Sequence, residues 1–404
     1  MMKRLLWISF FSYMLIAFTL VIMGAMLPEI LAYYKQNYSN GGLLIFSQFM
    51  GFLFGVISMP LLVNKLGRRN VVILGLIMIS FEVFAFFLPS WPFLFPLVWL
   101  AGFGAGLAEA CIASIILVTF QGQQARAMSK LEVAFGLGAL LIPFLSSLLI
   151  SKGIWEYAFL VLGLSTFMIT LGWKLLSFGE FEEILFKNIN HNTSANKESA
   201  HYTKKSFLII IFSAMFFFCY GGSEVAIVHF FPSIFMEEWG IPNALATITV
   251  TIYWLAMVIG RALTGVISEK ITYKFFLLLI TIGGIVVLTL LALNENIWFA
   301  FFLCFLLGLF MAGMFAIALI ITNQYFPGQT EKTTSILLAM NGLGGSLIPI
   351  MIGRSMDMYP SQISFWLLSS IMLVMLILII GVQILGYNNK KVSIVEQEHR
   401  FIKK

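Results

Sequence analysis

The sequence has few charged residues, few cysteines and none of the common catalytic motifs. Only 10% of its 404 residues are charged, far less than in an average soluble domain, and its three cysteines all fall in apolar segments. It has no Gly-Lys pair and so no ATP-binding loop, and it lacks His-Glu-x-x-His, Gly-x-Ser-x-Gly and Cys-x-x-Cys. We therefore expect no enzyme activity, no metal and no cofactor, and any work that the protein does must draw on a gradient.

Apolar residues are abundant instead. Hydrophobic residues make up 60% of the chain, and the mean hydropathy is +0.98. Segments long enough to cross a bilayer as helices cover about residues 5–27, 41–63, 71–88, 93–120, 129–151, 156–177, 206–236, 243–268, 274–293, 297–322, 333–353 and 361–386. The sequence thus predicts an all-α membrane protein of twelve transmembrane helices.

Part of the chain is repeated. Residues 102–143 reappear without a gap at 308–349, so that Gly136-Leu137-Gly138 matches Gly342-Leu343-Gly344 and Pro143 matches Pro349. Each copy holds a span, a short polar loop and a second span, which predicts two pseudo-symmetric halves of six helices. Parallel halves are typical of transporters in which one half rocks against the other around a central site.

A polar stretch separates the halves. We expect six-helix halves at 1–177 and 206–386, a cytoplasmic linker at 178–205 and a cytoplasmic tail at 387–404. A membrane-bound nutrient sensor that transports nothing would need a signalling domain, and neither the linker nor the tail is long enough to form one.

The basic residues predict the orientation. With the N-terminus inside, the outer segments hold only Lys35, Lys152 and Arg354, while most of the 24 Lys and Arg residues fall in inner segments. This bias predicts a multi-pass protein of a bacterial inner membrane with both termini in the cytoplasm. It also explains the net charge of +6 without nucleic-acid binding, and the basic tail can touch anionic lipid.

Among the ionisable residues within predicted spans, Glu109 stands out. It has more than ten mostly apolar residues on each side, between Pro96 and Phe120, which places it near mid-membrane. Because a charge there is costly, such an acid usually has a function, and we expect Glu109 to bind and release a proton. A permanently protonated Glu109 in a helix–helix hydrogen bond is the alternative. The repeat has Phe315 at the matching position.

The other acids in spans give less specific signals. Glu224 follows two adjacent glycines, which mark a candidate site, and we expect it to assist proton coupling. Glu132 is a candidate substrate ligand, although an ion pair with nearby Lys130 or Arg126 is also open. Glu82 is expected to make only a structural hydrogen bond.

Charged inner loops suggest a conformational latch. Glycine precedes a charged loop after span 2, at Asn64-Lys65-Leu66-Gly67-Arg68-Arg69, and again after span 8, where Arg261 is followed by Glu269. Charges at helix ends can pair in one state and separate in another, so a gating role is predicted for Asn64, Gly67, Arg68, Arg69, Arg261 and Glu269.

Neutral side chains are expected to bind a neutral substrate. Gln48 and Asn341 can each donate and accept hydrogen bonds. Trp254 and Tyr220 can offer ring faces to the apolar side of a sugar. For any single aromatic residue, packing against lipid or the core is the alternative.

These features together resemble the major facilitator superfamily. Twelve spans in two halves, a central linker and the loop at 64–69 match its pattern, although Asn64 stands where the family signature has Asp. The resemblance implies two parallel six-helix halves that alternate their access to the two sides of the membrane.

A narrower resemblance is to the fucose–galactose–glucose permease branch, which includes glucose/mannose:proton symporters of the Bacillus type. It is carried by Met128–Leu140, Gln48-Phe49, Gly104-Ala105-Gly106 with Glu109, Phe231-Pro232-Ser233-Ile234 and Trp254 before Gly260-Arg261. It implies that Glu109 matches an acid tied to proton translocation. Span 1 lacks the acid that the fucose permease has there, because Glu29 lies at its outer end.

The combined prediction is a proton-coupled importer of a hexose that works as a monomer. A proton-driven exporter of drugs or metabolites is the main alternative. Such exporters often carry Gly-Pro in span 5, whereas this chain has Gly136-Leu137-Gly138 and an isolated Pro143.

Overall fold

The computed structural model describes residues 2–120, 124–179, 182, 204–326 and 330–402, and the regular secondary structure in these ranges is all helical. Twelve helices or helix pairs are long and apolar enough to span a membrane, as predicted. The elements are α1 Met2–Ala25, α2 Leu27–Tyr34, α3 Tyr38–Leu66, α4 Arg68–Ser80, η1 Phe81–Phe87, α5 Trp91–Thr119, α6 Gln124–Ser151, α7 Tyr157–Leu175, α9 Lys204–Trp239, α10 Asn243–Lys270, α11 Tyr273–Leu293, α12 Ile297–Met311, α13 Met314–Gln324, α14 Thr330–Met358 and α15 Gln362–Ile402.

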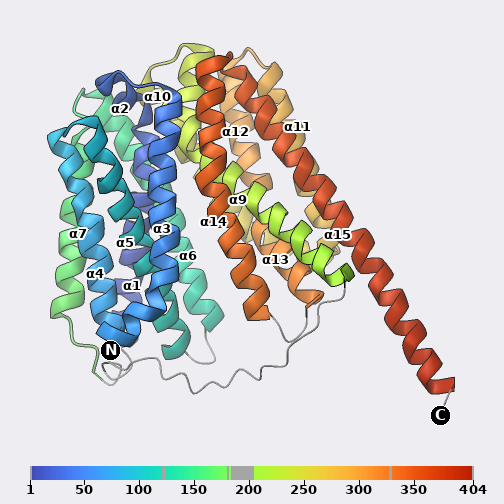
Figure 1. The fold of residues 1–404 in the computed structure, drawn as a ribbon. Helices are drawn as coiled ribbons and strands as arrows, with labels where there is room; N and C mark the ends of the chain where they lie inside the picture. The colour runs from blue at the N-terminus through green and yellow to red at the C-terminus, as the bar shows by residue number, and fades with distance from the viewer. Residues whose placement is uncertain (1, 121–123, 180–181, 183–203, 327–329, 403–404) are drawn as a thin grey trace.

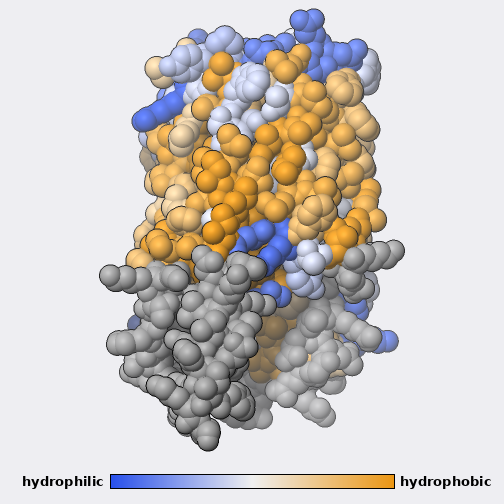
Figure 2. All heavy atoms as spheres, turned by 90° about the vertical axis from the view of Figure 1, so that its right-hand side faces the viewer, coloured by the Kyte–Doolittle hydropathy of each residue, from blue (hydrophilic) through white to orange (hydrophobic). Residues whose placement is uncertain are grey.

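Helices α1–α7 form one bundle and α9–α15 a second beside it (Figure 1). An apolar belt covers the middle of the molecule, and hydrophilic residues gather at one end of the view (Figure 2). The N-terminus and the start of α9 lie at the end that holds Lys3, Arg4, Arg68 and Arg69, here called the basic end. The other end carries Glu29, Glu156, Glu237, Glu238, Glu295 and Asp357, and is here called the acidic end.

Reciprocal glycines join α3 to α5. A methyl group at Gly51 or Gly55 would collide with the carbonyl oxygen of Trp99 or Phe103, and one at Gly102 or Gly106 would collide with that of Gln48 or Phe52. Two small-xxx-small faces therefore bring the backbones into direct contact, which is a common way to join helices in lipid.

The sequence repeat is visible in the packing. Gly138 of α6 lies against the Met14 carbonyl of α1, and its repeat partner Gly344 of α14 lies against the Phe218 carbonyl of α9. The same residue type thus joins the fifth span to the first span in each half, as the predicted pseudo-symmetry requires.

The two bundles meet most closely at the acidic end. Between α3 and α14 the contact runs from Tyr38 beside Gly353 to Leu53 beside Gly342, and toward the basic end the two ribbons diverge (Figure 1). Helices α6 and α10 stay in contact further, from Ser147 and Ala244 to Glu132 and Arg261. The structure is therefore closed at its acidic end.

Three local features depart from uninterrupted spans. A short helix, α2, follows span 1 and begins with a proline in its first turn. Span 3 changes from α-helix to 3-10 helix at Phe81. Span 10 is broken between α12 and α13 at Ala312-Gly313. None of these breaks followed from hydrophobicity alone.

Candidate functional site

A charged layer lies between the bundles toward the basic end. Glu132 of α6 and Arg261 of α10 form an ion pair of 3.6 Å, with side chains 56% and 36% exposed. The guanidinium of Arg261 also lies 5.8 Å from the centre of the Trp254 ring. Glu132 thus pairs across the two halves rather than with Lys130, and the side chain of Arg126, the other predicted local partner, lies outside the described residues.

Glu109 lies on the first-half side of this layer. The Tyr13 hydroxyl of α1 donates a hydrogen bond to the Glu109 backbone carbonyl at 3.2 Å, and Tyr13 is buried. One carboxyl oxygen of Glu109 is buried without a hydrogen-bond partner in the described part of the chain. Glu109 and Glu132 are close enough for their charges to interact. The first half therefore presents two neighbouring carboxyl groups.

Glu224 lies on the second-half side. It interacts with the hydroxyl of Tyr220, one turn earlier on α9, and with the charge of Arg261. Arg261 therefore pairs directly with Glu132 of the opposite half, and its charge also acts on Glu224 of its own half. Three carboxyl groups and one guanidinium form a set whose balance depends on how the halves sit and on how many protons are bound.

Neutral polar groups in both halves have buried atoms without hydrogen-bond partners among the described residues. Gln48 of α3 is fully buried and uses its Nε2 to donate to the Thr19 carbonyl at 2.8 Å, but its Oε1 has no donor among the described residues. Asn341 of α14 packs against Gly221 of α9, and its Oδ1 likewise has no described donor. The Ser223 hydroxyl of α9 is also buried without a described hydrogen-bond partner.

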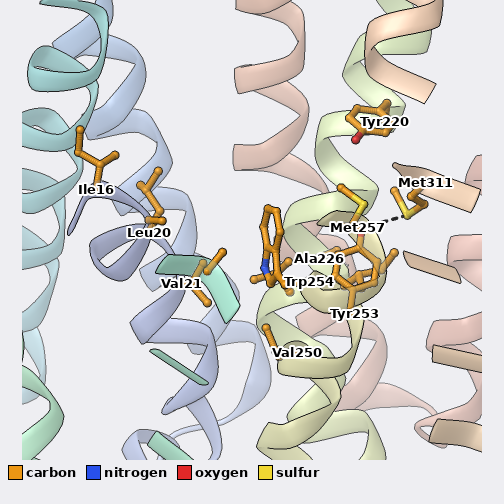
Figure 3. Packing of buried hydrophobic residues seen from close by; sticks show 14 of the residues in the cluster. Ile16, Leu20, Val21, Tyr220, Ala226, Val250, Tyr253, Trp254, Met257 and Met311 are labelled. Carbon is orange, nitrogen blue, oxygen red and sulfur yellow. Dashed lines mark hydrogen bonds between the residues drawn. The ribbon is translucent and has the colours of Figure 1, made fainter. Parts of the chain in front are cut away.

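Trp254 projects from α10 toward Leu20 and Val21 of α1, with Tyr253 and Tyr220 behind it (Figure 3). Its ring centre is 5.9 Å from that of Phe135 on α6, so the two aromatic residues face each other across the halves. The indole Nε1 has no acceptor in the described structure. A donor beside a large apolar face suits a ligand with hydroxyl groups on one edge and a hydrophobic face.

Two residues of this region were not predicted. His229 of α9 is buried against Gly24 of α1, with its ring 5.6 Å from that of Phe49 on α3. It is the one histidine of the sequence that falls in a span, and that position was its available signal. Tyr13 carried no signal beyond being a tyrosine in an apolar helix.

The predicted gating residues between spans 2 and 3 lie within the first half. Gly67 joins α3 to α4 with φ of 78°, a conformation that favours glycine. Arg69 donates to the carbonyls of Trp173 (2.8 Å), Lys174 (3.1 Å) and Leu176 (2.8 Å) at the end of α7, and it lies 4.0 Å from Glu182. Arg69 therefore fixes α4 to α7 and to the start of the linker.

The three other predicted gating residues, Asn64, Arg68 and Glu269, lie at or near helix ends. The backbone carbonyl of Arg68 accepts a bond from Cys111 of α5 at 3.3 Å. The Oδ1 atom of Asn64 is buried with no partner in the described ranges. Glu269 lies in the last turn of α10, and its side chain is outside the described part of the structure.

The prediction for Glu82 was wrong. Its side chain is completely buried in the 3-10 segment η1, and neither carboxyl oxygen has a hydrogen-bond partner among the described residues. The expected structural hydrogen bond is therefore not formed within the described residues.

Comparison with known proteins places this geometry in context. The model of the Major Facilitator Superfamily matches residues 9–225 and 207–393. The glucose/mannose transporter GlcP of Bacillus subtilis is 28% identical over 372 residues, 89% of each chain. A putative glucose/galactose transporter of Helicobacter pylori is 24% identical over 371 residues, 86% of this chain and 87% of that protein.

Solved structures share the fold. The nucleoside transporter NupG matches with a TM-score of 0.77 at 13% identity, covering 94% of this chain and 99% of that one. A D-xylose–proton symporter matches with a TM-score of 0.75 at 14% identity, covering 94% and 97%.

Proposed function

Because this chain belongs to the major facilitator superfamily, a family of secondary transporters, we propose that it imports a hexose together with a proton. The two curated relatives named above are described as carriers of glucose with mannose or galactose, and both match most of this chain. Their names support a sugar, and the arrangement of polar groups between the halves supports the same class.

The observation that carries the proposal is the pair of amide oxygens that lack donors. Gln48 Oε1 and Asn341 Oδ1 lie on opposite halves, and a buried acceptor without a donor is costly. A ligand that brings hydroxyl groups can donate to an amide oxygen, whereas a carboxylate, which offers only acceptors, cannot. Trp254 supplies a ring face and Tyr220 the wall behind it, so the proposed binding residues are Gln48, Glu132, Tyr220, Trp254 and Asn341.

The charged layer is the proposed site of proton coupling. In this scheme Glu109 takes a proton from the outside, with Glu224 assisting, before the loaded halves rock. Neutralising Glu109 removes its repulsion from Glu132, which then pairs more strongly with Arg261 of the other half. The proton thereby favours the conformation that holds this cross-half ion pair, and such differential stabilisation is what coupling requires.

The proposed orientation follows from the basic residues. The basic end faces the cytoplasm of a bacterial cell, with both termini inside, and the acidic end faces outward. The structure, which is closed at the acidic end, then corresponds to an inward-facing state. In that state sugar and proton are released to the cell interior.

The test is uptake of radiolabelled glucose into proteoliposomes under an imposed inward proton gradient. We expect accumulation above the outside concentration that collapses when an uncoupler is added, and no accumulation in protein-free liposomes. Failure of folded protein to take up glucose, mannose, galactose or fucose would overturn the sugar assignment. Proton-driven efflux of an unrelated compound would then favour the exporter.

A further inference from the structure

At the acidic end, a carboxylate of the second half caps a helix of the first half. Asp357, near the end of α14, accepts hydrogen bonds from the backbone N–H groups of Tyr38 (2.8 Å) and Ser39 (2.7 Å), and a third from the Ser39 hydroxyl. Tyr38 and Ser39 are the first residues of α3. The bonds therefore join the ends of two spans from opposite halves.

The position of Asp357 is favourable for physical reasons. The first N–H groups of a helix have no partner within the helix, and a long helix carries partial positive charge at its N-terminus. Helix α3 has 29 residues. A carboxylate that accepts two of these N–H groups makes charge-assisted bonds, which are stronger than neutral ones. Much of that gain is lost if the halves separate.

The reciprocal arrangement exists at the second span of the other half. Helix α10 begins at Asn243, whose Nδ2 donates to Glu29 of α2 at 2.6 Å. One turn further along α10, the Thr247 hydroxyl donates to the Ala25 carbonyl at 3.2 Å. Each half thus places one acidic residue at the first turn of the other half's second span.

Close backbone packing surrounds these bonds. A methyl group at Gly353 would strike the Tyr38 carbonyl, and one at Gly42 would lie 2.9 Å from the Pro349 carbonyl and the Ile350 Cα. The Tyr38 hydroxyl also donates to Glu237 of α9 at 2.6 Å, beside a hollow of about 410 Å³ that Glu237 and Glu238 help to line. Helices that approach this closely separate as units, so the bonds break together.

We propose that Asp357 and Glu29 form a reciprocal outer latch, which holds the acidic end closed and must release before substrate can enter from that side. This rests on the proposed alternating-access function. The latch differs from the charged layer, because its partners are backbone N–H groups and neutral side chains rather than a cation.

The latch is tested by measuring how far apart the two halves lie at the acidic end. Spin labels at Lys152→Cys and Glu295→Cys report this distance, because both residues are exposed and belong to opposite halves, and the native cysteines are buried. We expect the shorter distance to predominate in otherwise wild-type protein, with a minor population at a longer distance. Asp357→Asn should raise the ratio of the longer to the shorter distance about tenfold, the effect of losing a charge-assisted hydrogen bond. Asp357→Asn with Glu29→Gln should raise it further.

Glu238→Gln is the matched control. It makes the same charge change at the same end, but the bond that Glu238 accepts from Ser361 at 2.6 Å stays within the second half. We expect it to leave the distances unchanged. An equal shift in Glu238→Gln, or no shift in Asp357→Asn, would overturn the latch.

Two further measurements keep the test informative. Ser39→Ala removes one donor to Asp357 without touching its charge, and it should shift the ratio in the same direction by less. If Asp357→Asn does not fold, this variant decides alone, and an unchanged ratio would overturn the proposal. The distances do not depend on which substrate is carried, so a failed glucose assay would leave this result standing.

Discussion

Span 4 and span 10 arise from one repeated sequence pattern but differ at their centres. Span 4 is a continuous helix, α5, and carries Glu109. Span 10 is broken into α12 and α13. At the matching position it carries Phe315, whose ring centre lies 5.2 Å from that of Phe217 and 6.0 Å from that of Tyr220. The same architecture holds an acid in one half and an aromatic cluster in the other.

This difference indicates that the two halves contribute different side chains to the proposed mechanism. The first half supplies the neighbouring carboxyl groups of Glu109 and Glu132, which suit proton binding. The second half supplies Arg261, Glu224 and the rings of Phe315, Tyr220 and Trp254. Under the proposed function these rings contribute to sugar recognition together with Gln48 of the first half, and Arg261 and Glu224 balance the charge. Pseudo-symmetry thus provides the rocking scaffold, and asymmetric side chains provide the chemistry.

The largest expected effect comes from removing the acid of span 4. Glu109→Gln should abolish uphill accumulation of sugar while sparing exchange of sugar across the membrane, because the proposed proton carrier is lost but the binding site is kept. Uptake and counterflow in proteoliposomes measure the two activities separately. Phe315→Leu, at the matching position, should retain accumulation. Wild-type accumulation in Glu109→Gln would contradict the assignment.

Truncation of Phe315, the aromatic residue at the matching position of span 10, should instead lower stability and weaken sugar binding. Phe315→Ala removes a partly buried ring that packs against Phe217 and Tyr220, and the free energy of unfolding should fall, by less than the roughly 3–5 kcal/mol expected for a fully buried phenylalanine. The KM for sugar should rise, whereas the dependence on the proton gradient should remain. Thermal unfolding and uptake saturation report these quantities. Phe299→Ala, which removes an exposed ring, is the control. Loss of coupling in Phe315→Ala would contradict the division between the halves.

The ion pair between the halves should have a small effect on stability. Glu132 and Arg261 are both partly exposed. Each of Glu132→Gln and Arg261→Gln should therefore change the free energy of unfolding by no more than about 1 kcal/mol. Their uptake rates should nevertheless fall, since the pair joins the moving halves. Exchanging the charges, with Glu132→Arg and Arg261→Glu together, should restore part of the rate. A doubly exchanged protein slower than both single variants would argue against a direct pair.

The smallest effect concerns pH at the basic end. The Ser177 hydroxyl, the Phe178 N–H and the charge of Arg69 lower the pKa of Glu182 below its ordinary value of 4.5. Because the pKa of Glu182 is lower in the folded protein, ionised Glu182 stabilises the folded arrangement at pH values above 4.5. This stabilisation is lost as the pH falls through the lowered pKa. In the second half, Lys274 lies over Tyr325 at 5.5 Å, with no acid in the described contact.

The protection of the Phe178 amide against hydrogen exchange, measured against its intrinsic rate at each pH, should therefore decrease below pH 4.5, and Glu182→Gln should remove that dependence. Exchange near Lys274 should show no such step. A step of equal size at both places would mean that general acid unfolding is being measured.

Most of the fold was predictable, because membrane insertion depends on the length and hydrophobicity of segments, which composition reveals directly. The breaks at Phe81 and Ala312 were not, since local helix geometry depends on neighbouring helices. The sequence singled out Glu109, Glu224, Glu132 and Arg261 one by one. It did not reveal that Glu132 and Arg261 pair across the halves, because pairing depends on how the bundles are docked.

The glycine contact between α3 and α5 limits how this protein can diversify. The two helices carry Gln48 and Glu109, and they touch through their main chains, so neither can shift without the other. A lineage that adopts a new substrate is therefore expected to change side chains on α9, α10 or α14 first. Gly51, Gly55, Gly102 and Gly106 should remain small across such relatives, as the fixed core around which specificity evolves.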